Sequence, residues 1–221
     1  MKAKCFFLFL FIGIKMFSQL PKGFVYVEQV IPNLEVELRY YSDNNFVGKR
    51  IAGYESDTLI LTYEATVALK KVQEELQQRN LSLKIYDGYR PQRAVNDFIL
   101  WARDLNDTIN KNWFYPNVAK KDLFKEEYIA SRSGHSKGST VDLTIVDTVT
   151  KIPLDMGSSY DFFGYESWVN YKAISPIQKA NRQLLLQIML KYGFRNYPKE
   201  WWHFTLKKEP FPETYFDFVI K

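Results

Sequence analysis

Apolar spacing and capping residues predict three helices. One covers about 63–78, with apolar positions at Ala65, Ala68, Leu69, Val72 and Leu76. A second helix follows a turn and has Ala94, Phe98 and Trp101 on its inward face. The third opens at Ser175, a good N-cap, followed by Pro176, which suits a first turn. It should run to about Leu190 and stop at Gly193.

Alternating apolar and polar positions predict three strands. These cover 81–85, 141–145 and 202–206. Asp142 should lie on the opposite face of its strand from the neighbouring aliphatic residues. Residues 107–130 are mixed in character and should be irregular. Because strands and helices do not alternate regularly, we expect an α+β fold with an antiparallel sheet and helices packed against it.

The chain is expected to form one compact domain, residues 22–221, behind an export signal in residues 1–18. No repeat or linker interrupts the domain, and 46% hydrophobic and 17% aromatic residues suffice to bury a core and line a cleft. The first 18 residues have a basic start, ten apolar residues from Cys5 to Ile14, and a small residue, Ser18. A spanning helix needs about 20 apolar residues. We therefore expect cleavage near Ser18, no membrane span afterwards, and a periplasmic or secreted protein.

Charge and cysteine content exclude several function classes. Of the formal charge of +5, Lys2, Lys4 and Lys15 belong to the export signal, which leaves 27 basic residues interleaved with 25 acidic ones. This balance shows no basic stripe that would follow a nucleic acid backbone. Cys5 is the only cysteine. The mature chain therefore lacks a thiol nucleophile, thiolate metal ligands and disulfides.

The chain has two histidines, and each lies near acidic residues. His135 precedes Asp142 in a glycine-containing segment that permits a tight backbone, and His203 ends the sequence Glu-Trp-Trp-His. Catalytic zinc commonly takes three ligands from His, Asp or Glu and keeps one position for water. His135, Asp142 and His203 form such a set, and a metal there would acidify a bound water and polarise a carbonyl. As alternatives, either histidine could be an ordinary core or surface group, and Asp142 could cap a strand end.

Glu200 and Arg90 are predicted to act beside that metal. Residues three apart in an ideal strand point to opposite faces, so Glu200 should lie on a turn before the strand of His203, where Pro198 allows a bend. From there it could serve as the general base, or it could instead be a solvated turn acid. Arg90 follows a strand and could stabilise an oxyanion. A surface ion pair between Arg90 and Asp87 would explain the arginine equally well.

Together these segments resemble the D-alanyl-D-alanine dipeptidases of the VanX type, a group within the zinc D,D-peptidases of family M15. The resemblance covers nearly all of the mature chain and includes Leu38-Arg39-Tyr40, Asn45-Phe46, the Asp87–Pro91 turn with Ala94-Val95-Asn96, the His135–Asp142 segment, Met156-Gly157, Glu200–His203 and Tyr215–Phe218. It implies a compact α+β fold and one Zn2+ per chain on His135, Asp142 and His203. It also implies Glu200 as general base and acid, and Arg90 at the oxyanion.

The resemblance further implies how a small substrate is held. Asp161 and Tyr40 would meet the substrate ammonium, and Ser133 would meet its carboxylate. The expected reaction is hydrolysis of D-Ala-D-Ala to two D-alanines, in cell-wall turnover or glycopeptide resistance. Many members of the group act in the cytoplasm, so an export signal favours recycling or scavenging over resistance.

Two other functions are compatible with the same residues. A D,D-carboxypeptidase or endopeptidase acting on peptidoglycan stem peptides would need an open cleft, whereas a dipeptidase needs a closed pocket with anchors at both ends. A non-catalytic, zinc-stabilised wall-binding module would need a closed site, usually with four protein ligands. The mature chain has no cysteine and no third histidine for such a site.

Overall fold

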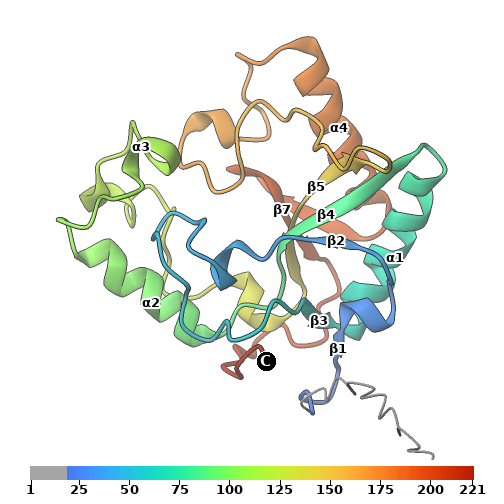
Figure 1. Ribbon diagram of the computed structural model, residues 1–221, viewed down its shortest axis with the longest axis horizontal. Coiled ribbons are helices and arrows are strands. Elements are labelled where there is room, and N and C mark those ends of the chain that lie inside the picture. The colour runs from blue at the N-terminus through green and yellow to red at the C-terminus, as the bar shows by residue number, and fades with distance from the viewer. Residues whose placement is uncertain (1–18) are drawn as a thin grey trace, which may run out of the picture.

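A five-stranded sheet forms the centre of the computed structural model, which describes residues 19–221 (Figure 1). The predicted export signal, residues 1–18, lies outside the described residues. The strands are ordered β2-β4-β5-β7-β6, and they cover Glu35–Val36 (β2), Leu81–Asp87 (β4), Thr140–Asp147 (β5), Glu200–Leu206 (β7) and Phe194–Tyr197 (β6). Neighbouring strands are antiparallel except that β2 runs parallel to β4. The predicted α+β class is confirmed, with a parallel edge pair that alternation alone could not reveal.

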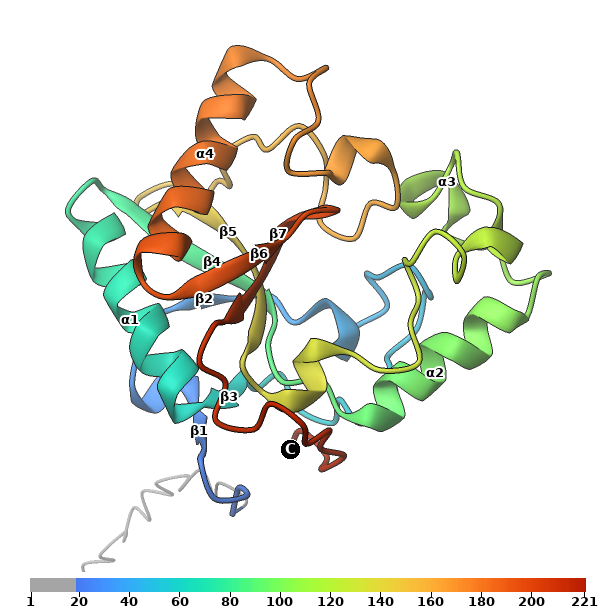
Figure 2. The ribbon, with the colours of Figure 1, turned by 180° about the vertical axis from the view of Figure 1, so that it is seen from behind.

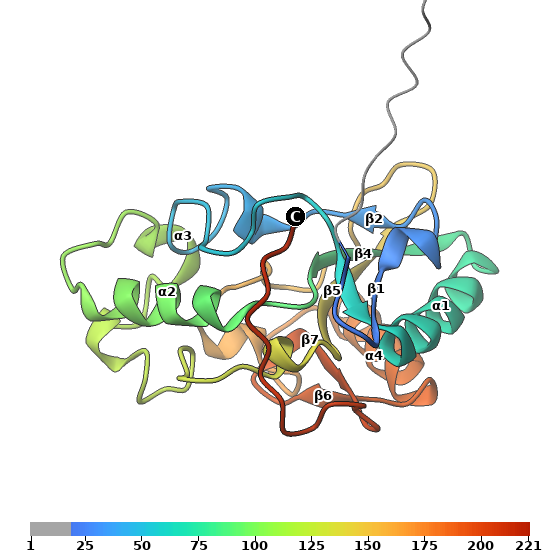
Figure 3. The same cartoon turned by 90° about the horizontal axis from the view of Figure 1, so that it is seen from below.

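Four α-helices occur in the described part of the chain, and they gather at two ends of the molecule. They are α1 (Tyr63–Gln77), α2 (Gln92–Arg103), α3 (Lys111–Phe114) and α4 (Pro176–Lys191). Helices α1 and α4 pack against β4 and β6, while α2 and α3 lie at the opposite end (Figures 2 and 3). A small antiparallel sheet of β1 (Phe24–Tyr26) and β3 (Ile60–Thr62) lies beside α1. Within residues 19–221, no helix is both long and apolar enough to span a membrane.

Local capping explains where two of the predicted helices begin and where one of them ends. The Thr62 side chain accepts a hydrogen bond from the Ala65 N–H and starts α1. Ser175 and Gln178 form a reciprocal capping box that starts α4. Gly193 follows the end of α4 with a φ of +89°, a conformation that glycine adopts without strain. All three helices agree with the sequence analysis, and 107–130 is irregular apart from α3 and short 3-10 turns.

The register of the central strands places three polar residues in one row. Asp87 on β4 pairs with Asp142 on β5, and Asp142 pairs with His203 on β7. Asp87 and Asp142 are buried, and His203 is half-buried. The strand of Asp142 is covered on both faces, so its polar side does not point to solvent. The row therefore collects charged groups inside the protein, at the end of the sheet that faces a pocket.

Candidate metal centre and active site

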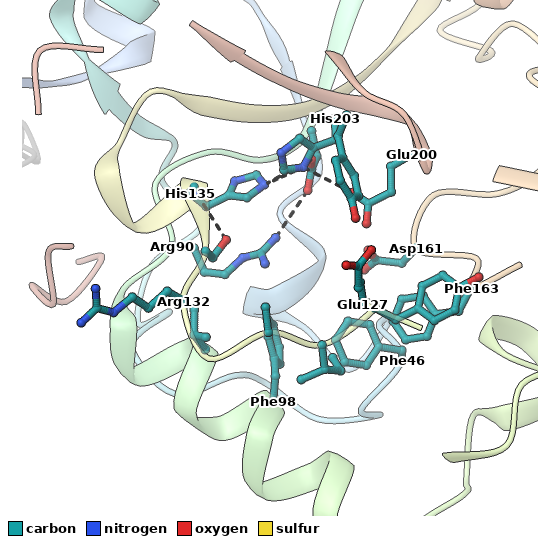
Figure 4. Close-up of a pocket in the computed structure, with 18 of the residues that line it drawn as sticks. Phe46, Arg90, Phe98, Glu127, Arg132, His135, Asp161, Phe163, Glu200 and His203 are labelled. Carbon is teal, nitrogen blue, oxygen red and sulfur yellow. Dashed lines mark hydrogen bonds and ion pairs between the residues drawn. The ribbon is translucent and has the colours of Figure 1, made fainter. Parts of the chain in front are cut away.

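Three potential metal ligands converge at this row (Figure 4). Nε2 of His135 lies 3.2 Å from Oδ1 of Asp142 and 3.4 Å from Nδ1 of His203. The third side of the triangle, from His203 Nδ1 to Asp142 Oδ1, measures 3.1 Å. Ligands at about 2.0–2.1 Å from zinc in a tetrahedron lie about 3.3–3.4 Å apart. The structure thus brings the three predicted donors to separations that suit one small ion.

The backbone around His135 fixes which ring nitrogen faces the site. His135 lies in a 3-10 turn, Gly134–Lys137, whose N-cap Ser133 accepts a hydrogen bond from the His135 N–H. Gly138 ends the turn with a φ of +80°, and a Cβ there would overlap the Phe24 ring. His135 Nδ1 is 2.7 Å from the carbonyl oxygen of Gly88, which can only accept. Nδ1 therefore carries the proton, and Nε2 keeps a lone pair for a metal.

The two oxygens of Asp142 have different surroundings. Oδ2 accepts hydrogen bonds from the Tyr160 hydroxyl at 3.2 Å and from Arg90 at 3.4 Å. Oδ1 is buried and faces the two imidazoles at 3.1 and 3.2 Å, with no other hydrogen-bond partner within the described residues. A buried carboxylate oxygen that faces two ring nitrogens is stable only when a cation, either a proton or a metal ion, occupies the space between them. The residues present therefore fit a bound metal, and Tyr160 and Arg90 orient the ligand carboxylate toward it.

The pKa shifts also indicate a site built around a cation. Burial opposes ionisation of Asp142, but its contacts with His135 and His203 hold its pKa well below the usual range. Burial also opposes a charge on His203, yet its contacts with Asp142 and Glu200 raise its pKa to about 9. In the metal-free site, the proton on the His203 imidazole therefore supplies the positive charge beside Asp142. A divalent ion bound by the same atoms would displace that proton.

Glu200 reaches the site by a route that the sequence analysis predicted wrongly. It was expected on a turn before the strand, but it is the first residue of β7 and pairs with Tyr197. The next pair is Asn196 with Phe204, so Trp201 to His203 have no opposite residue in β6. This irregularity breaks strict alternation, and Glu200 Oε2 lies 3.3 Å from His203 Nδ1. A carboxylate therefore stands beside the three donors without belonging to their triangle.

Arg90 is held inside the site by Asp87. Its Nε donates to Asp87 Oδ2 at 2.8 Å, and the Tyr54 hydroxyl donates to Oδ1 at 2.7 Å. The ion pair weighed in the sequence analysis therefore exists, but Asp87 is fully buried, so it is not a surface pair. The guanidinium also lies 4.9 Å from the centroid of the Tyr40 ring. These contacts fix Arg90 with one side toward Asp142 and the pocket.

The pocket in front of the donors has a volume of about 260 Å³ and contains the remaining predicted site residues, Tyr40, Ser133 and Asp161. Asp161 is buried and accepts a hydrogen bond of 2.8 Å from the Tyr40 hydroxyl. Burial raises the pKa of Asp161 well above its ordinary value, and the nearby Asp142 adds to this shift. Pockets for drug-sized ligands usually measure about 300–1,000 Å³. This smaller cavity suits a compact ligand with a positively charged group near Asp161.

Sequence reasoning missed two residues that support the site. Asp87 was considered only as a surface partner of Arg90, and Tyr160 was not considered. The register pair of Asp87 and Asp142 arises only in the folded sheet, so no local pattern indicates it. A weak signal for Tyr160 is its position directly before Asp161, which the resemblance did single out.

Three donors with an open side, an adjacent unliganded glutamate and a fixed arginine are typical of a mononuclear metal hydrolase. A family model described as D-ala-D-ala dipeptidase (Peptidase_M15) matches residues 21–221. The chain therefore belongs to this peptidase family.

Two relatives that match over nearly their whole length agree with the family assignment. The chain is 38% identical to the D-alanyl-D-alanine dipeptidase of Enterococcus faecium over 201 residues, covering 90% of this chain and 98% of that protein. It is also 38% identical to the D-alanyl-D-alanine dipeptidase of Streptomyces coelicolor, covering 89% and 98% of the two chains. A zinc-bound D,D-pentapeptidase structure from a VanB-type vancomycin resistance cassette is similar at 14% identity and a TM-score of 0.43, covering 70% of this chain and 77% of the other.

Proposed function

We propose that this protein is a zinc dipeptidase that hydrolyses D-Ala-D-Ala to two molecules of D-alanine. The observation that carries the proposal is the triangle of His135, Asp142 and His203 with Glu200 beside it, at the base of a small pocket. Relatives that share almost their whole length with this chain bear the name of that activity. The limited cavity volume favours a free dipeptide over the long peptides that an endopeptidase must admit.

Each group has a defined part in the proposed reaction. When bound by the three donors, zinc supplies Lewis acidity to the scissile carbonyl and lowers the pKa of a coordinated water. Glu200 accepts a proton from the attacking water and then delivers one to the leaving amine. Arg90 donates to the oxyanion that forms at the carbonyl carbon. One water is consumed, the peptide bond breaks, and the products are a carboxylate and an amine.

The same proposal assigns the two ends of the substrate. Asp161, hydrogen-bonded to Tyr40, would accept the ammonium group of the first D-alanine. Ser133, which also lines the pocket beside His135, would donate to the carboxylate of the second. Both assignments come from the resemblance and are supported by the presence of all three residues in one pocket. Anchors at both ends would align the scissile bond with Glu200 and Arg90.

We also propose that the catalytic domain, residues 22–221, is exported after removal of residues 1–18. This placement rests on the basic and apolar pattern of the first 18 residues. Outside the cytoplasm, free D-Ala-D-Ala would come from turnover of the cell wall. The proposed physiological role is therefore recycling or scavenging of D-alanine, and detection of the mature N-terminus near Gln19 in a periplasmic or culture fraction would support it.

The function is tested by assaying purified residues 19–221 on free D-Ala-D-Ala and on muropeptides. We expect two D-alanines per dipeptide and little release from muropeptides. Glu200→Ala should keep one zinc per chain while abolishing turnover, and Glu74→Ala, at an exposed position on α1, should leave both unchanged. Near-normal turnover by Glu200→Ala would remove that residue from the mechanism. Preferential cleavage of muropeptides would indicate a carboxypeptidase or endopeptidase instead.

A further inference from the structure

A lysine next to the proposed base is paired with a glutamate that lines the pocket. Lys199 lies in the turn between β6 and β7, immediately before Glu200. Its Nζ is 2.6 Å from Oε2 of Glu127 and 3.1 Å from the carbonyl oxygen of Glu126. It also lies 5.7 Å from the centroid of the Trp168 ring. Lysine side chains are usually solvated, but this one is 26% exposed and has three partners, whereas the Glu127 side chain is 65% exposed.

Glu127, the partner of Lys199, has an unusual backbone. Its φ is +65°, in the left-handed region that favours glycine. The turn before it is closed by hydrogen bonds from the Tyr128 and Ile129 N–H groups to the Leu123 carbonyl. Glycine would fit this position with less strain, yet the chain has a glutamate there that lines the pocket. Strained residues of this kind cluster at functional sites. The Glu127 carboxylate is therefore a candidate functional group.

The segments that carry the two partners are each fixed to the rest of the protein. The turn that carries Lys199 is held by a 3.0 Å hydrogen bond from the Val169 N–H to the Pro198 carbonyl. The segment after Glu127 is held by Tyr128, whose ring stacks on Phe163 at a centroid distance of 5.0 Å. The ion pair therefore joins two anchored segments rather than two mobile side chains. Exposed ion pairs contribute little to folding stability, so its position is of more interest than its strength.

Glu127 lies at the end of the pocket where the substrate ammonium would bind. In Figure 4, Glu127 and Asp161 lie on one side of the pocket, and His135 and Arg132 lie on the other. If Asp161 holds the substrate ammonium, which rests on the proposed function, a residue attached to that nitrogen would extend toward Glu127, which Lys199 holds in place. A longer peptide would have to displace the pair, and it would also lack the charge that Asp161 accepts.

We propose that the Glu127–Lys199 ion pair closes the amine end of the pocket and determines that only free dipeptides are cleaved. The pair acts on specificity and takes no part in bond breaking. Because one pair joins the two segments, removing either partner should open the same space. The two substitutions together should therefore have no more effect than one of them alone.

The test compares kcat/KM for D-alanine release from D-Ala-D-Ala and from diacetyl-L-Lys-D-Ala-D-Ala, a stem-peptide analogue. Lys199→Met keeps the aliphatic stem, and Glu127→Gly removes the carboxylate while relaxing the backbone. In each variant we expect the ratio of tripeptide to dipeptide kcat/KM to rise at least tenfold, with no further increase in the double variant. Lys179→Met on α4, and Lys151→Gly, which has a φ of +60° in the native chain, are matched controls that should leave the ratio unchanged.

The possible outcomes separate this inference from the proposed function. A parent chain that does not cleave D-Ala-D-Ala would contradict the proposed function. A parent chain that cleaves the dipeptide, with an unchanged ratio in both variants, would overturn the ion-pair inference alone. If a variant loses turnover of both peptides, calorimetry with the tripeptide in a zinc-loaded Glu200→Ala background decides the matter. Binding at least tenfold tighter than in Glu200→Ala alone supports the inference, and unchanged binding overturns it.

Discussion

The helix-covered part of the central sheet and its pocket end are built by different interactions. Where α1 and α4 pack on the strands, the core is largely aliphatic, with Leu69, Val72, Leu83 and Leu185 fully buried, and Gln73 is a buried polar residue hydrogen-bonded to β4. At the pocket end, strands β4, β5 and β7 bring together Asp87, Asp142 and His203. Burial of aliphatic groups is non-directional and tolerates exchange of similar residues. Buried charges are stable only with defined partners, so each one at the pocket end constrains its neighbours.

This contrast teaches that folding and catalysis depend on separate parts of one sheet. Substitutions under α1 and α4 should change stability and leave the chemistry of the folded fraction intact. Substitutions at the pocket end should change metal binding or turnover first.

The largest functional effect is expected from Asp142→Asn. This change keeps the shape and the hydrogen bond from Tyr160 but removes the anionic ligand. Because loss of an outer-shell partner already costs about 10–100-fold, we expect turnover to fall at least about 1,000-fold, with loss of bound zinc. Metal content and D-alanine release test this. A variant that retains one zinc per chain would contradict the ligand assignment.

On the helix side, Leu69→Ala tests the other half of the comparison. Leu69 is fully buried on α1, and truncation of such a residue costs about 2–5 kcal/mol of unfolding free energy. Urea unfolding should show that loss, while zinc content and kcat/KM of the folded protein stay at the parent values. A large fall in kcat/KM at temperatures where the variant is folded would show that the two regions are coupled.

A smaller effect is expected from Tyr160→Phe. The ring stacks on Tyr86 at 4.6 Å, so its packing should persist, but the hydrogen bond to Asp142 Oδ2 is lost. Zinc affinity should fall about 10–100-fold in competition with a chelator. Tyr165→Phe, at an exposed tyrosine, is the control. Unchanged affinity would mean that Asp142 needs no support from Tyr160.

The smallest effect, and one of opposite sign, is expected from Asp161→Asn in the metal-free chain. Burial raises the pKa of native Asp161 well above that of the unfolded chain, so above about pH 3.9 the unfolded state binds fewer protons than the native state. Stability contributed by this group therefore falls as pH rises toward the native pKa. The metal-free variant should gain stability over the metal-free parent at pH 8 and little at pH 4, and the KM of the zinc-loaded variant for D-Ala-D-Ala should rise. If urea unfolding shows the same stability difference between variant and parent at pH 4 and at pH 8, the raised pKa of Asp161 is contradicted.

The comparison also explains which features could be predicted from the sequence. Helices α1, α2 and α4 could be predicted from apolar spacing and from caps such as Ser175, because these signals act within a few residues. The three donor residues were found because their types and number suit a metal. Local patterns could not give the irregularity that turns Glu200 toward His203, because it depends on where β6 pairs with β7. They also could not show that Asp87 is buried, because its environment comes from strands and side chains distant in sequence.

The most direct test of this account is a crystal structure of zinc-loaded residues 19–221 with anomalous diffraction measured at the zinc edge. We predict one strong peak, about 2.0–2.2 Å from His135 Nε2, Asp142 Oδ1 and His203 Nδ1, with the carboxylate of Glu200 nearby but not bonded to the ion. A peak elsewhere, or Glu200 as a fourth protein ligand, would contradict the account.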